Sequence, residues 1–136
     1  IVLCLSCRAI AANTPAMLLA GEWQCDDARL HIDEAIKLVG PTAAMLDTRA
    51  IVTFCKADNA TAAQQAVEDL QLALAVSAEP VIGLHLALAL QRSGNNAAAE
   101  QTLRSALADG LDRAELSPHD RSRYDELTKT RALESL

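Results

Sequence analysis

One spacing motif, which occurs three times, constrains the fold of this chain more than any other sequence feature. The motif is small-large-small: an alanine, a large aliphatic residue four positions later, and a second alanine three positions after that. Its occurrences are Ala28-Ile32-Ala35, Ala66-Leu70-Ala73 and Ala99-Leu103-Ala106. Positions three and four residues apart share one face of an α-helix, so each motif predicts a helix that a neighbouring helix can approach closely.

The clearest copy lies in the stretch 80–111. Apolar residues recur from Leu84 to Leu90, a breaker follows at Ser93-Gly94-Asn95-Asn96, and the third motif comes next. This order predicts two helices joined by a tight turn. The motif starts at Ala28, Ala66 and Ala99, intervals of 38 and 33 residues that are typical of stacked helical hairpins.

Composition supports a single packed domain of helices. The chain has 136 residues, of which 51% are hydrophobic and 22% charged, and it has one each of Trp, Tyr and Phe. Alanine and leucine dominate, so we expect a core of close helix contacts. The net charge of −6 argues against nucleic acid as a partner. No apolar run reaches the roughly 20 residues of a membrane span.

Local signals place the helix ends. We expect helices at about residues 2–12, 15–20, 26–39, 42–56, 61–77 and 118–134, besides the pair in 80–111. Thr61-x-x-Gln64 has the pattern of a capping box. Ser117-Pro118-x-Asp120 predicts a helix start with a serine cap, proline in the first position and a carboxylate near the positive helix end. The polar terminal helix is expected to cap a stacked array.

These units resemble the tetratricopeptide repeat family. In the best unit, Leu86, Ala87 and Leu90 match the first helix, Gly94 the turn, and the third motif the second helix. The middle unit has extra residues near 59–63 and no turn glycine, and in the first unit only the second helix is recognisable. LDTRAIV at 46–52 and LHLALAL at 84–90 look like the closing repeats of large bacterial members.

The resemblance implies an all-α fold: a right-handed α-solenoid of about three helix-turn-helix hairpins in a single domain, 1–136. Its repeats would span about 2–41, 42–78 and 80–111, with a C-terminal capping helix at about 117–134. Because the sequence begins at Ile1 and not at Met, we expect it to be a fragment or a processed chain.

The family's concave groove, built mainly from first helices, receives peptides or helices of partner proteins. Projected onto this sequence, the groove positions are Asp47, Ile51, Phe54, Cys55, Leu84, Leu88, Gln91 and Arg92. Phe54 and Leu88 would be apolar anchors, so a Leu88→Asp change should abolish partner capture and leave the chain helical. Members that clamp a chaperone's terminal carboxylate use Lys and Asn here. Asp47 and Ile51 stand at such positions, so that role is not expected.

Cysteine and acidic residues offer possible metal ligands. Cys4-x-x-Cys7 with Cys25 and His31 lacks the second closely spaced pair typical of a structural zinc site, so reduced thiols are the preferred interpretation, and they suit the cytoplasm. Asp26, Asp27, Asp33 and Glu34 do not all share one helix face, so we interpret them as solvated charges. The sequence therefore predicts neither a metal nor another cofactor.

One histidine needs a separate reading. His85, on a first helix, would come near Cys55 if the hairpins stack, but a Cys-His nucleophile also needs an orienting group and an oxyanion site. Neither is visible in the sequence, so a packing or partner-contact histidine is the preferred interpretation.

The leading functional hypothesis is a non-catalytic scaffold that binds another protein, a peptide segment, or upstream repeats of its own chain. Two alternatives remain open. The chain is either a structural segment that seals a longer array, or a regulatory domain of a larger enzyme whose catalytic part lies outside this sequence. Deletion of 112–136 separates the first alternative from a binding role, because a pure seal would affect stability and not affinity.

Overall fold

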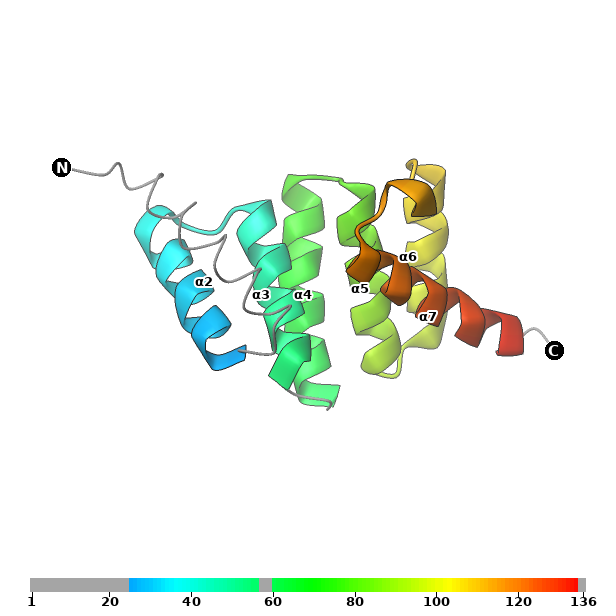
Figure 1. Ribbon diagram of the computed structural model, residues 1–136, viewed down its shortest axis with the longest axis horizontal. Helices are drawn as coiled ribbons and strands as arrows, with labels where there is room; N and C mark the ends of the chain where they lie inside the picture. The colour runs from blue at the N-terminus through cyan, green and yellow to red at the C-terminus, as the bar shows by residue number, and fades with distance from the viewer. Residues whose placement is uncertain (1–24, 57–59, 135–136) are drawn as a thin grey trace.

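The computed structural model describes residues 25–56 and 60–134, and within these ranges the only regular secondary structure is helical (Figure 1). The helices are α2 (Cys25–Val39), α3 (Ala43–Lys56), α4 (Ala60–Val76), α5 (Pro80–Arg92), α6 (Asn96–Ala108), the short 3₁₀ helix η1 (Arg113–Glu115) and α7 (Pro118–Glu134). The predicted all-α class is confirmed. The helices expected at about 2–12 and 15–20 lie outside the described residues.

Helices α2 to α6 follow one another in a row, each packed against the next in sequence (Figure 1). The three small-large-small motifs lie on α2, α4 and α6, and each of their nine residues is at most 5% exposed. The prediction that these faces are helix contacts is therefore confirmed. Helix α7 departs from the row, because it packs against α5, the first helix of the last hairpin.

Two glycines end the helices of the last hairpin. Gly94 and Gly110 have φ angles of 89° and 106°, which favour a residue without a side chain. Asn95 N–H donates to the Leu90 carbonyl, and Leu111 N–H donates to the Ala106 carbonyl, each at 2.9 Å. These bonds satisfy carbonyls that the last helical turn leaves free, and they turn the chain sharply after α5 and after α6.

Three of the described α-helices start with a polar side chain that accepts a backbone hydrogen bond, as N-caps do. The oxygens of Thr42, Asn95 and Ser117 accept from the N–H groups of Met45, Ala98 and Asp120. The predicted start of α7 is thus confirmed. Thr61 was expected to precede α4 as its N-cap, but the helix already begins at Ala60. Thr61 therefore lies in the first turn of α4, and the predicted helix start is one residue too late.

The core continues along the row. Ile32, Ala35 and Met45 join α2 to α3. A larger cluster, which includes Leu46, Leu70 and Leu86, joins α3, α4 and α5. The guanidinium of Arg49 on α3 donates two hydrogen bonds, of 2.8 and 2.7 Å, to the carboxylate of Asp69 on α4. This forked pair fixes the relative position of the two helices.

The close approach of α5 and α6 at Gly83 predicts a measurable cost for one added methyl group. A Cβ at Gly83 of α5 would lie 2.9 Å from the Ala106 Cβ of α6. We expect Gly83→Ala to lower the free energy of unfolding by about 1–2 kcal/mol, because overpacking outweighs the better helix propensity of alanine. Urea titration measures it. In the double variant with Ala106→Gly, the loss should be smaller than the sum of the single losses; simple additivity would contradict the contact.

Candidate functional site

A buried histidine lies where three helices meet. His85, in the middle of α5, is only 4% exposed. Its Nδ1 donates to Asp47 Oδ1 of α3 at 2.6 Å, and its Nε2 donates to Asp120 Oδ1 of α7 at 2.8 Å. The side chains of both aspartates are 15% exposed. One imidazole ring therefore links the first helices of two hairpins to the terminal helix.

The two carboxylates keep this imidazole protonated. Burial alone would lower the pKa of His85, but its hydrogen bonds to Asp120 and Asp47 outweigh burial and raise the pKa from 6.5 to about 9. For Asp120, burial would raise the pKa, but the bond from His85 and those from Arg123 and Ser117 lower it below the ordinary value. At neutral pH the cluster is thus an imidazolium between two carboxylates.

Asp120 is held by its own helix as well. Arg123 Nη1 donates to Asp120 Oδ1 at 2.6 Å, and the Ser117 hydroxyl donates to Asp120 Oδ2 at 2.9 Å. The capping serine and the first-turn carboxylate therefore support each other, and the carboxylate is aimed at α5. The sequence signal for this helix start was correctly recognised, whereas the contact of Asp120 with His85 was missed.

An apolar contact continues the site along α5. Leu84, Ala87 and Leu88 of α5 form one buried cluster with Leu103 and Ala106 of α6 and with three leucines that follow α6 in the chain, Leu111, Leu116 and Leu127. Phe54, Val81 and Tyr124 pack against it. We call the side of α5 that carries Leu84, His85 and Leu88 the α5 face. In the structure α7 lies on this face.

A second charged residue of α5 meets α7 at the far end of the same face. The Arg92 guanidinium carbon lies 4.8 Å from the ring centre of Phe54, a cation-π distance. Arg92 Nη2 also lies 3.8 Å from Glu126 Oε2 of α7. His85 and Arg92, both cationic, thus each meet a carboxylate of the terminal helix.

The structure brings most of the predicted groove residues together around α7. Asp47 and Phe54 come from α3, and Leu84, Leu88 and Arg92 come from α5. Ile51 is buried at 8% and Gln91 is half-buried. The side chain of Cys55 lies outside the described residues.

Leu84 and Leu88 require a correction. The groove hypothesis treats them as open to a partner, but both are 0% exposed, in a cluster formed with α6 and with the leucines that follow it in the chain. Leu88 is therefore not an accessible anchor in this arrangement of the chain. For Leu88→Asp the burial of Leu88 leads us to expect a loss of helical structure instead, since the new carboxylate would be buried.

The described residues do not form the geometry that a Cys-His nucleophile or a metal site would need. Both ring nitrogens of His85 are hydrogen-bonded to carboxylates, so neither is free to accept a proton from a thiol. In the described ranges no group of three or more His, Cys, Asp or Glu could hold a metal ion. Cys4 and Cys7 and the side chain of Cys25 lie outside these ranges. Asp33 accepts a hydrogen bond from Arg29 at 2.9 Å, as expected for a charge on a helix surface.

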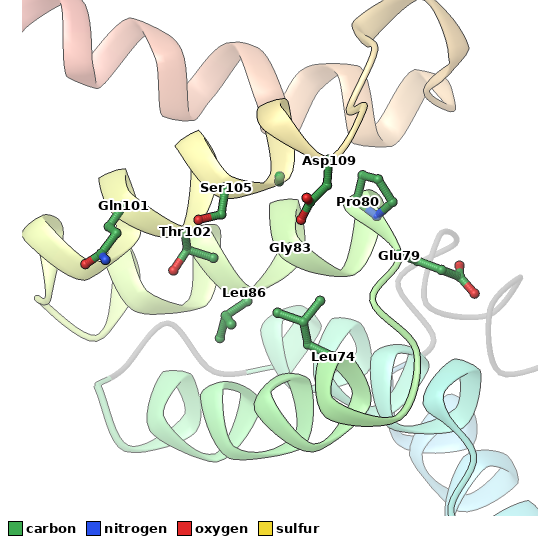
Figure 2. A pocket seen from close by; sticks show the side chains of 10 residues that line it. Leu74, Glu79, Pro80, Gly83, Leu86, Gln101, Thr102, Ser105 and Asp109 are labelled. Carbon is green, nitrogen blue, oxygen red and sulfur yellow. The ribbon is translucent and has the colours of Figure 1, made fainter.

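A separate hollow of about 210 Å³ lies between α4 and the last hairpin. Figure 2 shows Leu74 of α4 and Leu86 of α5 on one side of it, with the polar side chains Gln101, Thr102 and Ser105 of α6 along its rim. The three polar residues are exposed or half-buried, and no pattern in the sequence predicted this hollow.

Comparison with family models, with curated proteins and with solved structures finds no match to this chain. In the part of the chain that the structure describes, no helix is both long and apolar enough to span a membrane. The fold and site define an all-helical chain of consecutive packed helices with a charged helix lying on the α5 face.

Proposed function

We propose that this chain is a non-catalytic protein-interaction module, a solenoid of tetratricopeptide-like hairpins that holds a helix of a partner protein against α3 and α5. One observation carries the proposal: the α5 face already holds a helix, α7, through an apolar cluster and two charge contacts. A surface with this shape and charge suits an amphipathic helix, which lays its apolar side into a groove and places charges at its edges.

The succession of helices supports the same function. The buried small-large-small motifs hold α2, α4 and α6 close to their neighbours. The first helices α3 and α5 contact each other directly, and Asp47 of α3 reaches His85 of α5. Such an arrangement presents side chains of two hairpins on one rigid surface. The proposal includes a cytoplasmic location, because cysteine thiols stay reduced in that compartment.

The accessible edge of this surface consists of Phe54, Gln91 and Arg92. Phe54 and Gln91 are half-buried, and the Arg92 side chain is 34% exposed. An aromatic ring under a guanidinium is the kind of rigid amphipathic pair on which interfaces often depend. A partner helix would meet this pair first.

Selection of helical peptides tests the proposal. A displayed library of amphipathic helices, selected against the folded full chain, should yield binders whose affinity falls at least tenfold in Phe54→Ala or Arg92→Ala. The matched control variants are Leu72→Ala and Val76→Ala, which remove apolar side chains that are 59% and 72% exposed on α4. Binders that depend on α4 and ignore Phe54 and Arg92 would refute the assignment of this face.

A structural role for α7 is the second candidate, and the burial of Leu84 and Leu88 favours it. In this structural role, which we call the seal, α7 only covers the apolar end of the row of helices. The seal predicts that α7 is as stably docked as α5 itself, which distinguishes it from an occupant that a partner can replace.

A further inference from the structure

We infer that α7 is a replaceable occupant of the α5 face and that a helix of a partner protein displaces it. This partner helix carries a carboxylate in its first turn, apolar residues four and seven positions after that carboxylate, and a second carboxylate six positions after it. This inference deepens the proposed function and rests on it. The pattern is that of α7 itself, in which Asp120 is followed by Tyr124, Glu126 and Leu127.

The hold of α7 on the rest of the chain is small. Among its residues from 118 to 129, Leu127 is the only buried one, and four are half-buried: Asp120, Arg123, Tyr124 and Thr128. By contrast, every residue of α5 from Ile82 to Leu90 is buried. Segments with few buried apolar contacts open at a lower free energy than the core, so α7 is suited to leave while α5 and α6 stay folded.

The segment that connects α6 to α7 leaves a hollow beside the start of α5, although its Leu111 and Leu116 are buried. A hollow of about 340 Å³ lies between Pro80 and Val81 on one side and Leu111, Leu116 and Ser117 on the other. The connection is also short, which keeps α7 at an effective concentration of about a millimolar near its site. A partner in solution therefore has to bind the vacated face considerably more tightly than α7 does.

Charge complementarity defines the chemistry of the partner. The α5 face carries two cations, imidazolium His85 and Arg92, and α7 meets them with Asp120 and Glu126. Asp47 neutralises only one side of the imidazolium, so the Nε2 side requires an acceptor from whichever helix lies on the face. A partner with a first-turn lysine would instead leave that buried N–H unpaired and add a like charge.

The test uses a fluorescent peptide of residues 117–134 and two chains of all 136 residues, the wild type and an opened variant with Asp120→Asn and Leu127→Ala. Fluorescence anisotropy should show at least tenfold tighter binding to the opened variant, because its own α7 competes less. On the opened variant a peptide with Asp120→Asn should bind at least tenfold more weakly, whereas a peptide with Asp125→Asn should lose about twofold or less. Asp125 is the matched control because its pair with Arg113 of η1 also joins α7 to the rest of the chain, but both side chains are 52% exposed, and such surface pairs contribute little.

Equal binding to both chains, or equal binding of the Asp120→Asn and Asp125→Asn peptides, would overturn the inference. If library-selected helices still require Phe54 and Arg92 in that case, the proposed function stands and only the role of α7 is wrong. If they do not, both fail.

A second measurement decides the question even where the opened variant does not fold. In the wild-type chain, amide hydrogen exchange of residues 119–129 should be at least tenfold faster than that of residues 84–90. Equal protection of α7 and α5 would make α7 a permanent part of the fold, which is the seal reading.

Discussion

Replacing His85 with leucine is expected to lower the free energy of unfolding by about 3–5 kcal/mol, the loss typical when one partner of a buried ion pair is removed. The reason is the position of the two carboxylates. Asp47 and Asp120 both bond to the ring, and without it both carboxylates, largely shielded from water, would lose the cation that they share, although Asp120 would still pair with Arg123. Equilibrium urea denaturation, followed by circular dichroism, measures the loss.

A compensated variant separates charge from packing. Adding Asp47→Asn and Asp120→Asn to the leucine variant removes both carboxylate charges, so much of the lost stability should return. The matched exposed pair is Arg113 and Asp125, in which the guanidinium donates two 2.7 Å bonds on the surface. Arg113→Leu should change stability far less than His85→Leu. Similar losses for the two variants would mean that the buried imidazolium has no special role.

The pH dependence of stability gives the same cluster a second readout. The pKa of His85 is raised from 6.5 to about 9, so the folded state binds this proton more tightly than the unfolded state. The stabilisation is fully present below pH 6.5 and is lost as the pH rises through 9. The pKa of Asp120 is lowered, so its contribution is lost as the pH falls below the ordinary aspartate range. The leucine variant should lack the alkaline loss.

Leu88→Asp is expected to destabilise the protein by more than about 4 kcal/mol and to reduce its helix content at room temperature. Leu88 is 0% exposed in the cluster between α5, α6 and α7, so the new carboxylate would be buried without a partner. The milder Leu88→Ala, which leaves a cavity, should cost about 2–5 kcal/mol. Thermal and urea unfolding, monitored by circular dichroism, provide both values.

The control for Leu88 is a solvent-exposed leucine of α4. Leu72 is 59% exposed, and Leu72→Asp should change the free energy of unfolding by about 0.5 kcal/mol or less. A stable, fully helical Leu88→Asp chain would contradict the burial of this face under α7. It would instead support the open groove that the sequence reading expected.

The contrast between Leu88 and Ser117 shows what kind of information a sequence carries. The start of α7 was predictable, because Ser117, Pro118 and Asp120 act within one helical turn. The motif faces of α2, α4 and α6 were predictable too, since helical periodicity alone selects the residues that must be covered. The register of α4 was missed by one residue, as its start depends on weak local preferences.

The sequence by itself determined the helices, their turns and the faces that pack, because these follow from interactions between residues close together in the chain. Only the tertiary structure decided where α7 lies and what His85 is for. Asp47, His85 and Asp120 are separated by 38 and 35 residues, and no local pattern relates them. Their meeting depends on how the last hairpin and the terminal helix pack together, and that packing puts a charged helix on the face that the sequence alone would have left open.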